Sequence, residues 1–290
     1  MLLQQTVNGL SIGSVYALIA VGYSLIYSIL QFSNFAHGSF LVAGAYAGFF
    51  VLSMKIFPMY IGVVAAFVFS GITATVVERL AYRPIRAHGA KTLYFIIASM
   101  GISIFCENFI IAGIGPQFRT YPPLLPFKSF SFGEFTVGIL DIVSATVAIV
   151  FLALLQYFIA RTKTGMAIRA AAFDLQVAGV MGVNVNRILT TVFFIAGFLA
   201  GIAGVVLGVK YTVYPQLGYL TIKAFVAAIF GGLGSLPGAI VGSLLLGLLE
   251  TYTAAFVSTT LRDLIVFFTL ILVLLFRPNG IMGIYTEEKV

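Results

Sequence analysis

The sequence is organised around the stretch ARTKTGMAIRAAAFDLQVAGVMGVNVNR (160–187), the longest part of its second half that cannot lie inside a lipid bilayer. The stretch holds four basic residues and one acid, and an apolar run long enough to span a membrane lies on each side of it. Lys and Arg beside membrane spans are enriched on the cytoplasmic side. The stretch therefore predicts a cytoplasmic loop that joins two membrane-spanning helices.

The same loop has the pattern of a short folded helix. Asp174 can accept hydrogen bonds from the free N–H groups of a following helical turn, and Gly182 can adopt the left-handed conformation that ends such a turn. We therefore expect a capped helix over 175–181. Its small, mostly apolar side chains would let the backbone lie close in a groove on another protein. A helix that lies against lipid and a plain connector are the alternatives for this pattern.

The composition is that of a membrane protein. Hydrophobic residues make up 61% of the 290 residues, charged residues make up 9%, and the mean hydropathy is +1.10. Ordinary soluble domains contain roughly 25% charged residues. Because each crossing needs about 20 apolar residues, spans and short loops use nearly the whole chain. We expect one all-α, polytopic transmembrane domain over residues 1–290, with no soluble catalytic domain.

Charge and cysteine content exclude several other classes. The net charge of +7 does not indicate a nucleic-acid partner, because the basic residues cluster in loops beside spans. The single cysteine, Cys106, excludes an intramolecular disulfide and a cysteine-rich metal site. No Lys or Arg precedes Lys55, so we expect the first apolar run to remain as a span rather than to act as a signal peptide.

The apolar runs predict a helical bundle of nine membrane spans, at 7–30, 39–52, 60–77, 92–113, 136–159, 188–209, 217–230, 237–252 and 261–276. The short runs on either side of GGLGSLPG (231–238) would give eight spans if they formed a re-entrant pair. Basic residues predict that 78–91, 160–187 and the tail after Arg277 are cytoplasmic. Counting the crossings then places 114–135 and the N-terminus outside.

The two halves of the sequence resemble each other weakly. Both HGSFLVAGAYAG (37–48) and LGSLPGAIVGSLLLG (233–247) follow a span and a break, and both contain a Gly-Ser step and a small-residue helix. Inverted repeats of this kind occur in transporters, where interrupted helices in matching positions lie beside the central pathway. Chance is an equally good explanation, because Gly-Ser steps are frequent in Gly-rich membrane proteins.

Four polar residues in or near the spans are candidates for function. Asn34 and His37 lie at the break after the first span, where they either line a pathway or satisfy free backbone groups. Glu107 and Glu250 lie within apolar runs, where an ionisable side chain is costly and is a functional candidate. Glu250 is near the end of its run, so an interfacial carboxylate is the alternative. No Lys, Arg or His is an obvious partner for Glu107.

The sequence contains no sign of its own energy source. GGLGSLPG (231–238) has glycines but lacks the GK[ST] ending of a phosphate-binding loop. Two scattered acids give little support to coupling by an ion gradient. An external source of energy is therefore favoured.

Six segments, taken together, resemble a known family over nearly the whole chain. They are GSVYALIAVGYSLIY (13–27), NFAHGSFLVAGAYAG (34–48), ERLAYRPIRAHG (78–89), GMAIRAAAFDLQVAGVMGVNVNR (165–187), FFIAGFLAGIAGVVLG (193–208) and AFVAAIFGGLGSLPGAIVGSLLLGLLE (224–250). In this order they resemble the inner-membrane permeases of branched-chain amino-acid ABC importers. The NFAHG form is similar to the LivH-like rather than the LivM-like subunit.

The resemblance implies a transport subunit of the cell inner membrane that is not itself an enzyme and holds no cofactor or metal. Its implied partners are a LivM-like second permease, two ABC ATPase subunits and a periplasmic substrate-binding protein. The loop 160–187 would dock into an ATPase, although Phe173 replaces the polar residue that usually precedes Asp174. We assign ATPase coupling to Arg169, Asp174, Ala178, Gly182 and Arg187, and the translocation pathway to Asn34, His37, Gly38, Gly231, Gly232, Gly234 and Glu250.

Leucine, isoleucine and valine are the cargo that the resemblance implies. A related permease for urea or short-chain amides is one alternative, and a self-sufficient secondary transporter or channel is another. An intramembrane enzyme is disfavoured, because the sequence lacks a paired nucleophile and base and a metal-ligand cluster.

Overall fold

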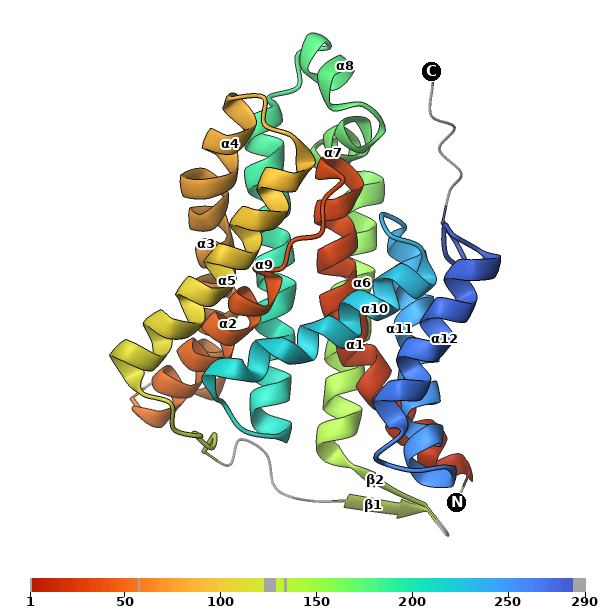
Figure 1. The fold of residues 1–290 in the computed structure, drawn as a ribbon. Helices are drawn as coiled ribbons and strands as arrows, with labels where there is room; N and C mark the ends of the chain where they lie inside the picture. The colour runs from red at the N-terminus through yellow and green to blue at the C-terminus, as the bar shows by residue number, and fades with distance from the viewer. Residues whose placement is uncertain (1, 57, 123–128, 133–134, 284–290) are drawn as a thin grey trace.

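The structure, a computed structural model, describes residues 2–56, 58–122, 129–132 and 135–283. It is an all-α bundle with one small antiparallel hairpin, β1 (Ser129–Phe132) and β2 (Phe135–Gly138), in which Ser129 pairs with Gly138 (Figure 1). In chain order the helices are α1 (Leu2–Leu30), α2 (His37–Ser53), α3 (Met59–Val77), α4 (Arg83–Ala87), α5 (Thr92–Ile114), α6 (Ile139–Arg161), α7 (Lys163–Phe173), α8 (Leu175–Val180), α9 (Val185–Lys210), α10 (Leu220–Gly231), α11 (Leu236–Phe256) and α12 (Arg262–Phe276). A π-helical turn, Glu78–Tyr82, joins α3 to α4, and a 3₁₀ turn, Pro215–Tyr219, precedes α10.

Six helical segments in the described part of the chain are long and apolar enough to cross a membrane. They are α1, Met59–Ala87 (α3 through α4), α5, α6, α9 and α11. The predicted count of eight or nine spans is not confirmed, and neither is the inverted repeat. The 12 residues of α10 reach only about 18 Å, whereas the hydrocarbon core of a bilayer is about 30 Å thick.

The start of the run predicted at roughly 136–159 is not helical, because α6 starts at Ile139. Residues Phe135–Gly138 pair with the preceding strand instead, because the β-branched residues Thr136 and Val137 suit a strand. The prediction for 114–135 covers residues 123–128 and 133–134, which lie outside the described part of the chain, as do 284–290 of the predicted tail.

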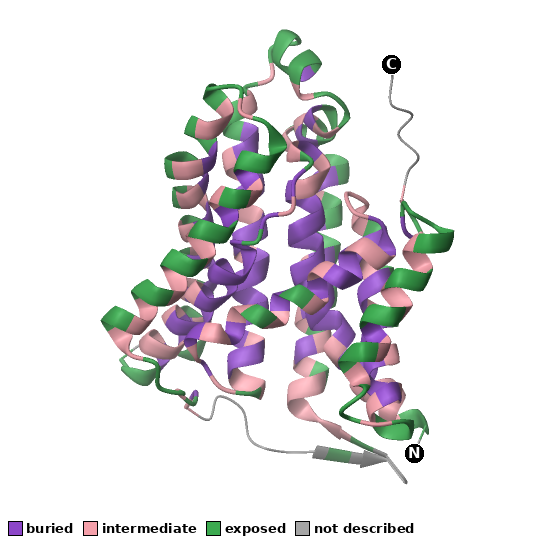
Figure 2. Ribbon diagram, in the orientation of Figure 1, coloured by how far each residue is buried: buried purple, intermediate pink, exposed green. Residues whose placement is uncertain are grey.

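Close helix contacts at glycine hold the core together. A Cβ atom on Gly44 of α2 would lie 2.5 Å from the Cα of Gly201 of α9, and one on Gly13 of α1 would lie 2.9 Å from the Cα of Leu244 of α11. Lipid tails are as apolar as Leu, so helices in a membrane associate by packing, and small residues let their backbones approach. The bundle is therefore built around α1, which is buried along most of its length, and α9 (Figure 2).

Helix α5 contrasts with this core. Only Phe95 and Ser99 of its 23 residues are buried, and Figure 2 shows the helix largely exposed at one side of the bundle. Exposed side chains from one end of α5 to the other include Leu93, Ile104 and Phe109. This apolar surface is available to lipid or to another subunit.

The two ends of the bundle carry different features. Figure 1 shows α4, α7 and α8 at one end, and the hairpin β1–β2 and the start of α1 at the other. The segments 78–91 and 160–187, which we predicted to share one side of the membrane, do lie at the same end.

Candidate functional site

The break between α1 and α2 is shaped by Asn34. Its Oδ1 accepts a hydrogen bond from the Ala36 N–H at 3.1 Å and another from the Tyr82 hydroxyl at 2.7 Å. These contacts tie the break to the π-helical turn and satisfy a free backbone group of the chain that enters α2. The structure therefore places Asn34 within the protein, as a support for the break.

His37 is the first residue of α2 and is fully buried. Its ring centroid lies 4.4 Å from that of Tyr23, and a Cβ on Gly22 would come within 2.7 Å of the His37 Cε1. Neither ring nitrogen has a hydrogen-bond partner of normal geometry among the described residues. The imidazole therefore packs against α1 by shape.

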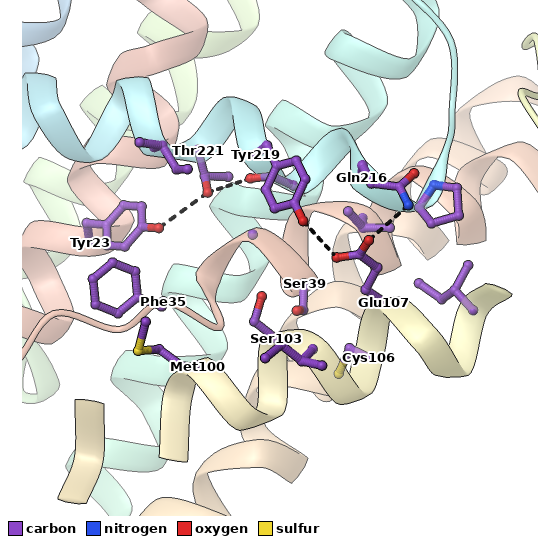
Figure 3. A pocket seen from close by; sticks show the side chains of 17 residues that line it. Tyr23, Phe35, Ser39, Met100, Ser103, Cys106, Glu107, Gln216, Tyr219 and Thr221 are labelled. Atoms are coloured by element: carbon purple, nitrogen blue, oxygen red, sulfur yellow. Dashed lines mark hydrogen bonds between the residues drawn. The ribbon is translucent and has the colours of Figure 1, made fainter. Parts of the chain in front are cut away.

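A cavity of about 200 Å³ opens next to this break. Its walls come from α1, the break, α2, α5, the 3₁₀ turn and α10 (Figure 3). Gly38 is the only predicted pathway residue that lines it. A Cβ on Gly38 would lie 2.8 Å from the Gly218 carbonyl oxygen, so glycine at this position lets α2 approach the 3₁₀ turn.

Glu107 projects from α5 into the same cavity (Figure 3). Its carboxylate accepts hydrogen bonds from Gln216 Nε2 at 2.9 Å and from the Tyr219 hydroxyl at 3.4 Å. On the other side of the cavity the Tyr23 hydroxyl donates to Thr221 Oγ1 at 3.3 Å. The cavity is thus lined by apolar side chains, several hydroxyl and amide groups, and one carboxylate.

The second predicted break, at 231–238, has other neighbours. Gly232 and Gly234 have φ values of +114° and +85°, which favour glycine. A Cβ on Gly232 would lie 2.5 Å from the Gly283 N, and the atom nearest to Gly234 would be the Ser28 Cα at 3.6 Å. Gly231 packs against Gly238 where α10 turns into α11. The structure therefore does not bring this break into the cavity at Gly38.

Glu250 lies apart from both breaks, in a charged network. It is 3% exposed, so its carboxylate lies among protein side chains. Its carboxylate accepts hydrogen bonds from the Tyr16 hydroxyl at 2.9 Å and Lys223 Nζ at 2.8 Å, and it lies 3.3 Å from Arg262 Nε. Lys223 also pairs with Asp263 at 2.8 Å. The network joins α1, α10, α11 and α12.

Sequence analysis missed the partners of this network. Lys223 is a single basic residue in an apolar run, and that unusual position was the available signal. A second missed pair joins Lys210 and Asp141 at 2.7 Å, between the end of α9 and the start of α6.

A third missed pair lies at the end of the bundle that carries α8. Glu78 is fully buried, and its carboxylate lies 3.2 Å from the Arg86 guanidinium and accepts a hydrogen bond from Thr190 at 2.9 Å. Arg86 also donates to Asn186 at 2.8 Å. We had counted Arg86 only as a positive charge of the loop, but it fastens α4 to the beginning of α9.

The predicted capped helix is present as α8. Asp174 Oδ1 accepts hydrogen bonds from the Gln176 and Val177 N–H groups at 2.8 and 2.9 Å. Gly182 follows with a φ of +87° and ends the turn. The predicted end at 181 is one residue too late, because Val180 is the last helical residue and Met181 is the C-cap.

The direction in which the side chains of α8 point corrects one expectation. Ala178 is 4% exposed and faces the protein, so it is not free to enter a groove on another protein. The exposed apolar side chains at and beside α8 are instead those of Val177, at 56%, and of Phe173, Val180 and Met181, at 90%, 88% and 79%. A six-residue helix has a single inner face, and Ala178 occupies it.

The two coupling arginines are placed differently. The Arg169 guanidinium donates to the Ile159 carbonyl oxygen and so fastens α7 to the end of α6. Arg187 is exposed in the first turn of α9, where its N–H donates to the Asn184 cap at 3.1 Å. Both arginines are exposed, but the Arg169 guanidinium binds the backbone of α6, whereas Arg187 contributes its backbone N–H to the cap of α9.

Within the described ranges, no group of three or more His, Cys, Asp or Glu side chains lies close enough together to hold a metal ion.

Comparisons with known proteins found similar sequences and a similar solved structure. The family model described as "Branched-chain amino acid transport system / permease component" matches residues 5–274. A solved structure titled "PsaBC from Streptococcus pneumoniae in complex with Fab" is 15% identical and has a TM-score of 0.49, with 91% of this chain and 88% of that chain covered.

Curated relatives match over almost their full lengths. The high-affinity branched-chain amino acid transport system permease protein BraD of Pseudomonas aeruginosa is 40% identical, with 99% of this chain and 98% of BraD covered. The permease protein LivH of the corresponding system in Escherichia coli is 38% identical, with 99% and 97% covered. The chain therefore belongs to the family of branched-chain amino acid transport system permeases.

Proposed function

We propose that the protein is the LivH-like permease subunit of an ATP-driven importer in the cell inner membrane, and that it carries leucine, isoleucine and valine inward. The observation that carries this proposal is the match to BraD and LivH over 99% of the chain. Both are named as permeases of high-affinity branched-chain amino acid systems. The helical bundle, with its largely apolar cavity and single carboxylate beside the break between α1 and α2, suits a transport subunit.

The proposed complex contains a LivM-like second permease, two ABC ATPases and a periplasmic binding protein. The exposed apolar surface of α5 would pack against the second permease. The apolar tip formed by Phe173, Val180 and Met181 at α8 would enter a groove on an ATPase. Asp174 and Gly182 shape that tip, and Arg169 fixes α7 beneath it.

In this proposal residues 1–290 form a single membrane domain. The segments 78–91, 160–187 and 277–290 face the cytoplasm, and the N-terminus and 114–135 face outward. Helices α2 and α12, and α10 together with the 3₁₀ turn before it (215–231), add three crossings to the six long ones and give nine, or eight with a re-entrant pair at 231–238. An inverted repeat would relate α2 to α11, each of which begins after a break.

Uptake in cells tests the proposed function. Cells without their own branched-chain importers would express this chain with the second permease, ATPases and binding protein of its organism. We expect uptake of radiolabelled leucine that disappears when the ATPase is inactivated. If the cells took up urea but not leucine, urea would be the cargo instead of branched-chain amino acids. Transport by liposomes that contain only this chain, driven by an ion gradient, would replace the ATP-driven mechanism.

The docking of α8 has its own test. Val180→Arg places a charge on the exposed tip, and burying an unpaired charge costs several kcal/mol. We expect the ATPase to be lost on purification, while the chain still inserts and folds because Val180 is 88% exposed. Val180→Ala is the matched control, which shortens the side chain without adding charge. If the ATPase co-purified fully with the Val180→Arg variant, α8 would not be part of the interface with the ATPase.

A further inference from the structure

Glu107 is unlike the other described acids of the chain. Glu78, Asp141, Glu250 and Asp263 each form an ion pair, and Asp174 caps a helix. Within the described residues Glu107 forms no ion pair and has only the neutral donors Gln216 and Tyr219. The residues that line its cavity include no Lys, Arg or His.

The position of Glu107 makes this arrangement costly. The residue lies 15 positions after Thr92 and seven before Ile114, the two ends of α5, which is one of the membrane-spanning helices. An ionisable side chain inside a membrane is rare and usually faces a water-filled cavity, a partner charge or a transported species. Neutral amide and hydroxyl donors stabilise a carboxylate, but they leave its negative charge without a counter-charge.

The rest of the cavity is suited to a small amphipathic solute. Apolar side chains, among them Phe35, Met100, Ile104 and Ile222, line the same cavity as the carboxylate and the hydroxyl groups of Ser103 and Thr221. In Figure 3 Glu107 lies at one end of the cavity with Gln216 and Tyr219, while Phe35 and Met100 lie toward the other end. A molecule with a cationic group and an apolar body would match both ends.

We propose that Glu107 is a specificity-determining residue of the translocation pathway, whose carboxylate binds the ammonium group of the amino acid as it crosses the membrane. The apolar wall contacts the aliphatic side chain, and the hydroxyl group of Ser103 donates to the solute carboxylate. This inference rests on the proposed function. The negative charge of Glu107 is then neutralised by each solute molecule in turn instead of by a fixed basic residue.

Cys106 supplies a direct probe of this cavity. It is the single cysteine of the chain, lines the same cavity and is only half-buried. The rate of its alkylation by a small maleimide in the purified full complex therefore reports whether the cavity is occupied. We expect 3-methylbutylamine, which keeps the ammonium and aliphatic groups of leucine, to slow this alkylation. 4-Methylpentanoate, which lacks the ammonium group, should not.

Variants at Glu107 complete the test. In Glu107→Gln we expect 3-methylbutylamine to lose its protection of Cys106, and leucine transport at saturating binding protein to fall about tenfold, because a charged hydrogen bond is lost. Glu107→Asp, which keeps the charge, should restore part of both. The second permease and the ATPase should co-purify with both variants as they do with the wild-type chain, which separates solute binding from a structural effect.

Three results would overturn the inference. One is normal transport by Glu107→Gln, and another is equal protection of Cys106 by the amine and the carboxylate. The third combines two observations: the amine does not protect Cys106 in the wild-type complex, and the Glu107→Gln variant fails to assemble. Glu107 would then be a contact with the second permease. In each of these cases the wild-type complex would still take up leucine. The inference about Glu107 would then fail while the proposed function would hold.

Discussion

Glu250 and Glu107 are both glutamates in apolar helices, yet their carboxylates have different neighbours. Glu250 faces Lys223 and Arg262, and its charge is balanced inside the chain. Glu107 faces only the neutral side chains of Gln216 and Tyr219. A buried carboxylate with fixed basic partners is part of the framework, whereas one without them remains free to bind a cation that comes and goes.

The helices that carry the two acids also differ in how closely they pack against the rest of the bundle. Helix α11 packs closely on α1, as the contact of Gly13 with Leu244 shows, and the network of Glu250 lies next to this contact through Tyr16. Helix α5 is exposed along most of its length. Stability is therefore concentrated on the α1–α11 side, and the cavity of Glu107 lies on the side with less internal support.

The largest expected loss of stability comes from a substitution in the charged network of Glu250. Glu250→Gln leaves Lys223 with only the half-exposed Asp263 as its anionic partner. Removing one member of a buried pair costs about 3–5 kcal/mol. We expect the free energy of unfolding, measured by denaturant titration in mixed micelles, to fall by about 3 kcal/mol. Unchanged unfolding would mean that the network does not support the fold.

A double variant sharpens this result. Lys223→Met combined with Glu250→Gln removes both charges, so neither remains unpaired in the protein. We expect the double variant to be less destabilised than the sum of the single variants, with a coupling energy of about 1–3 kcal/mol. Additive effects in the same denaturant titration would show that Lys223 and Glu250 act independently.

Asp174 represents an intermediate case, because its carboxylate is held by backbone N–H groups instead of by basic side chains. Asp174→Ala should destabilise α8 by about 1 kcal/mol. Hydrogen exchange would show faster exchange at residues 175–180, with α9 unaffected. The matched control is Asn184→Ala, which removes the side-chain cap of α9 and should act only there. Equal exchange of α8 in Asp174→Ala and the unmodified protein would contradict this role.

The smallest effect on stability is expected at Glu107. Glu107→Gln keeps the size of the side chain and its neutral neighbours, so we expect the free energy of unfolding to change by less than about 1 kcal/mol. It is also the size-matched control for Glu250→Gln in the same titration. If both variants were equally destabilised, the distinction between the two carboxylates would fail.

Local features were predictable from the sequence because their causes lie within a few residues. The cap of α8 depends on Asp174 and the two N–H groups that follow it, and its start was predicted correctly. The strand before α6 was missed, because its pairing depends on a second segment that the apolar run does not reveal. The inward direction of Ala178 was missed for a related reason, since the face that a short helix buries depends on what lies beneath it.

The sequence by itself determined that the chain is a bundle of apolar helices, where its basic loops lie along the chain, and that α8 is capped, because hydropathy and capping act over short distances. Only the tertiary structure decided which acids are neutralised. Glu250 meets Tyr16 across 234 positions and Lys223 across 27, and Glu107 meets Gln216 across 109. Charges so far apart in sequence become neighbours only through helix packing, and packing made one glutamate part of the framework and left the other facing a cavity.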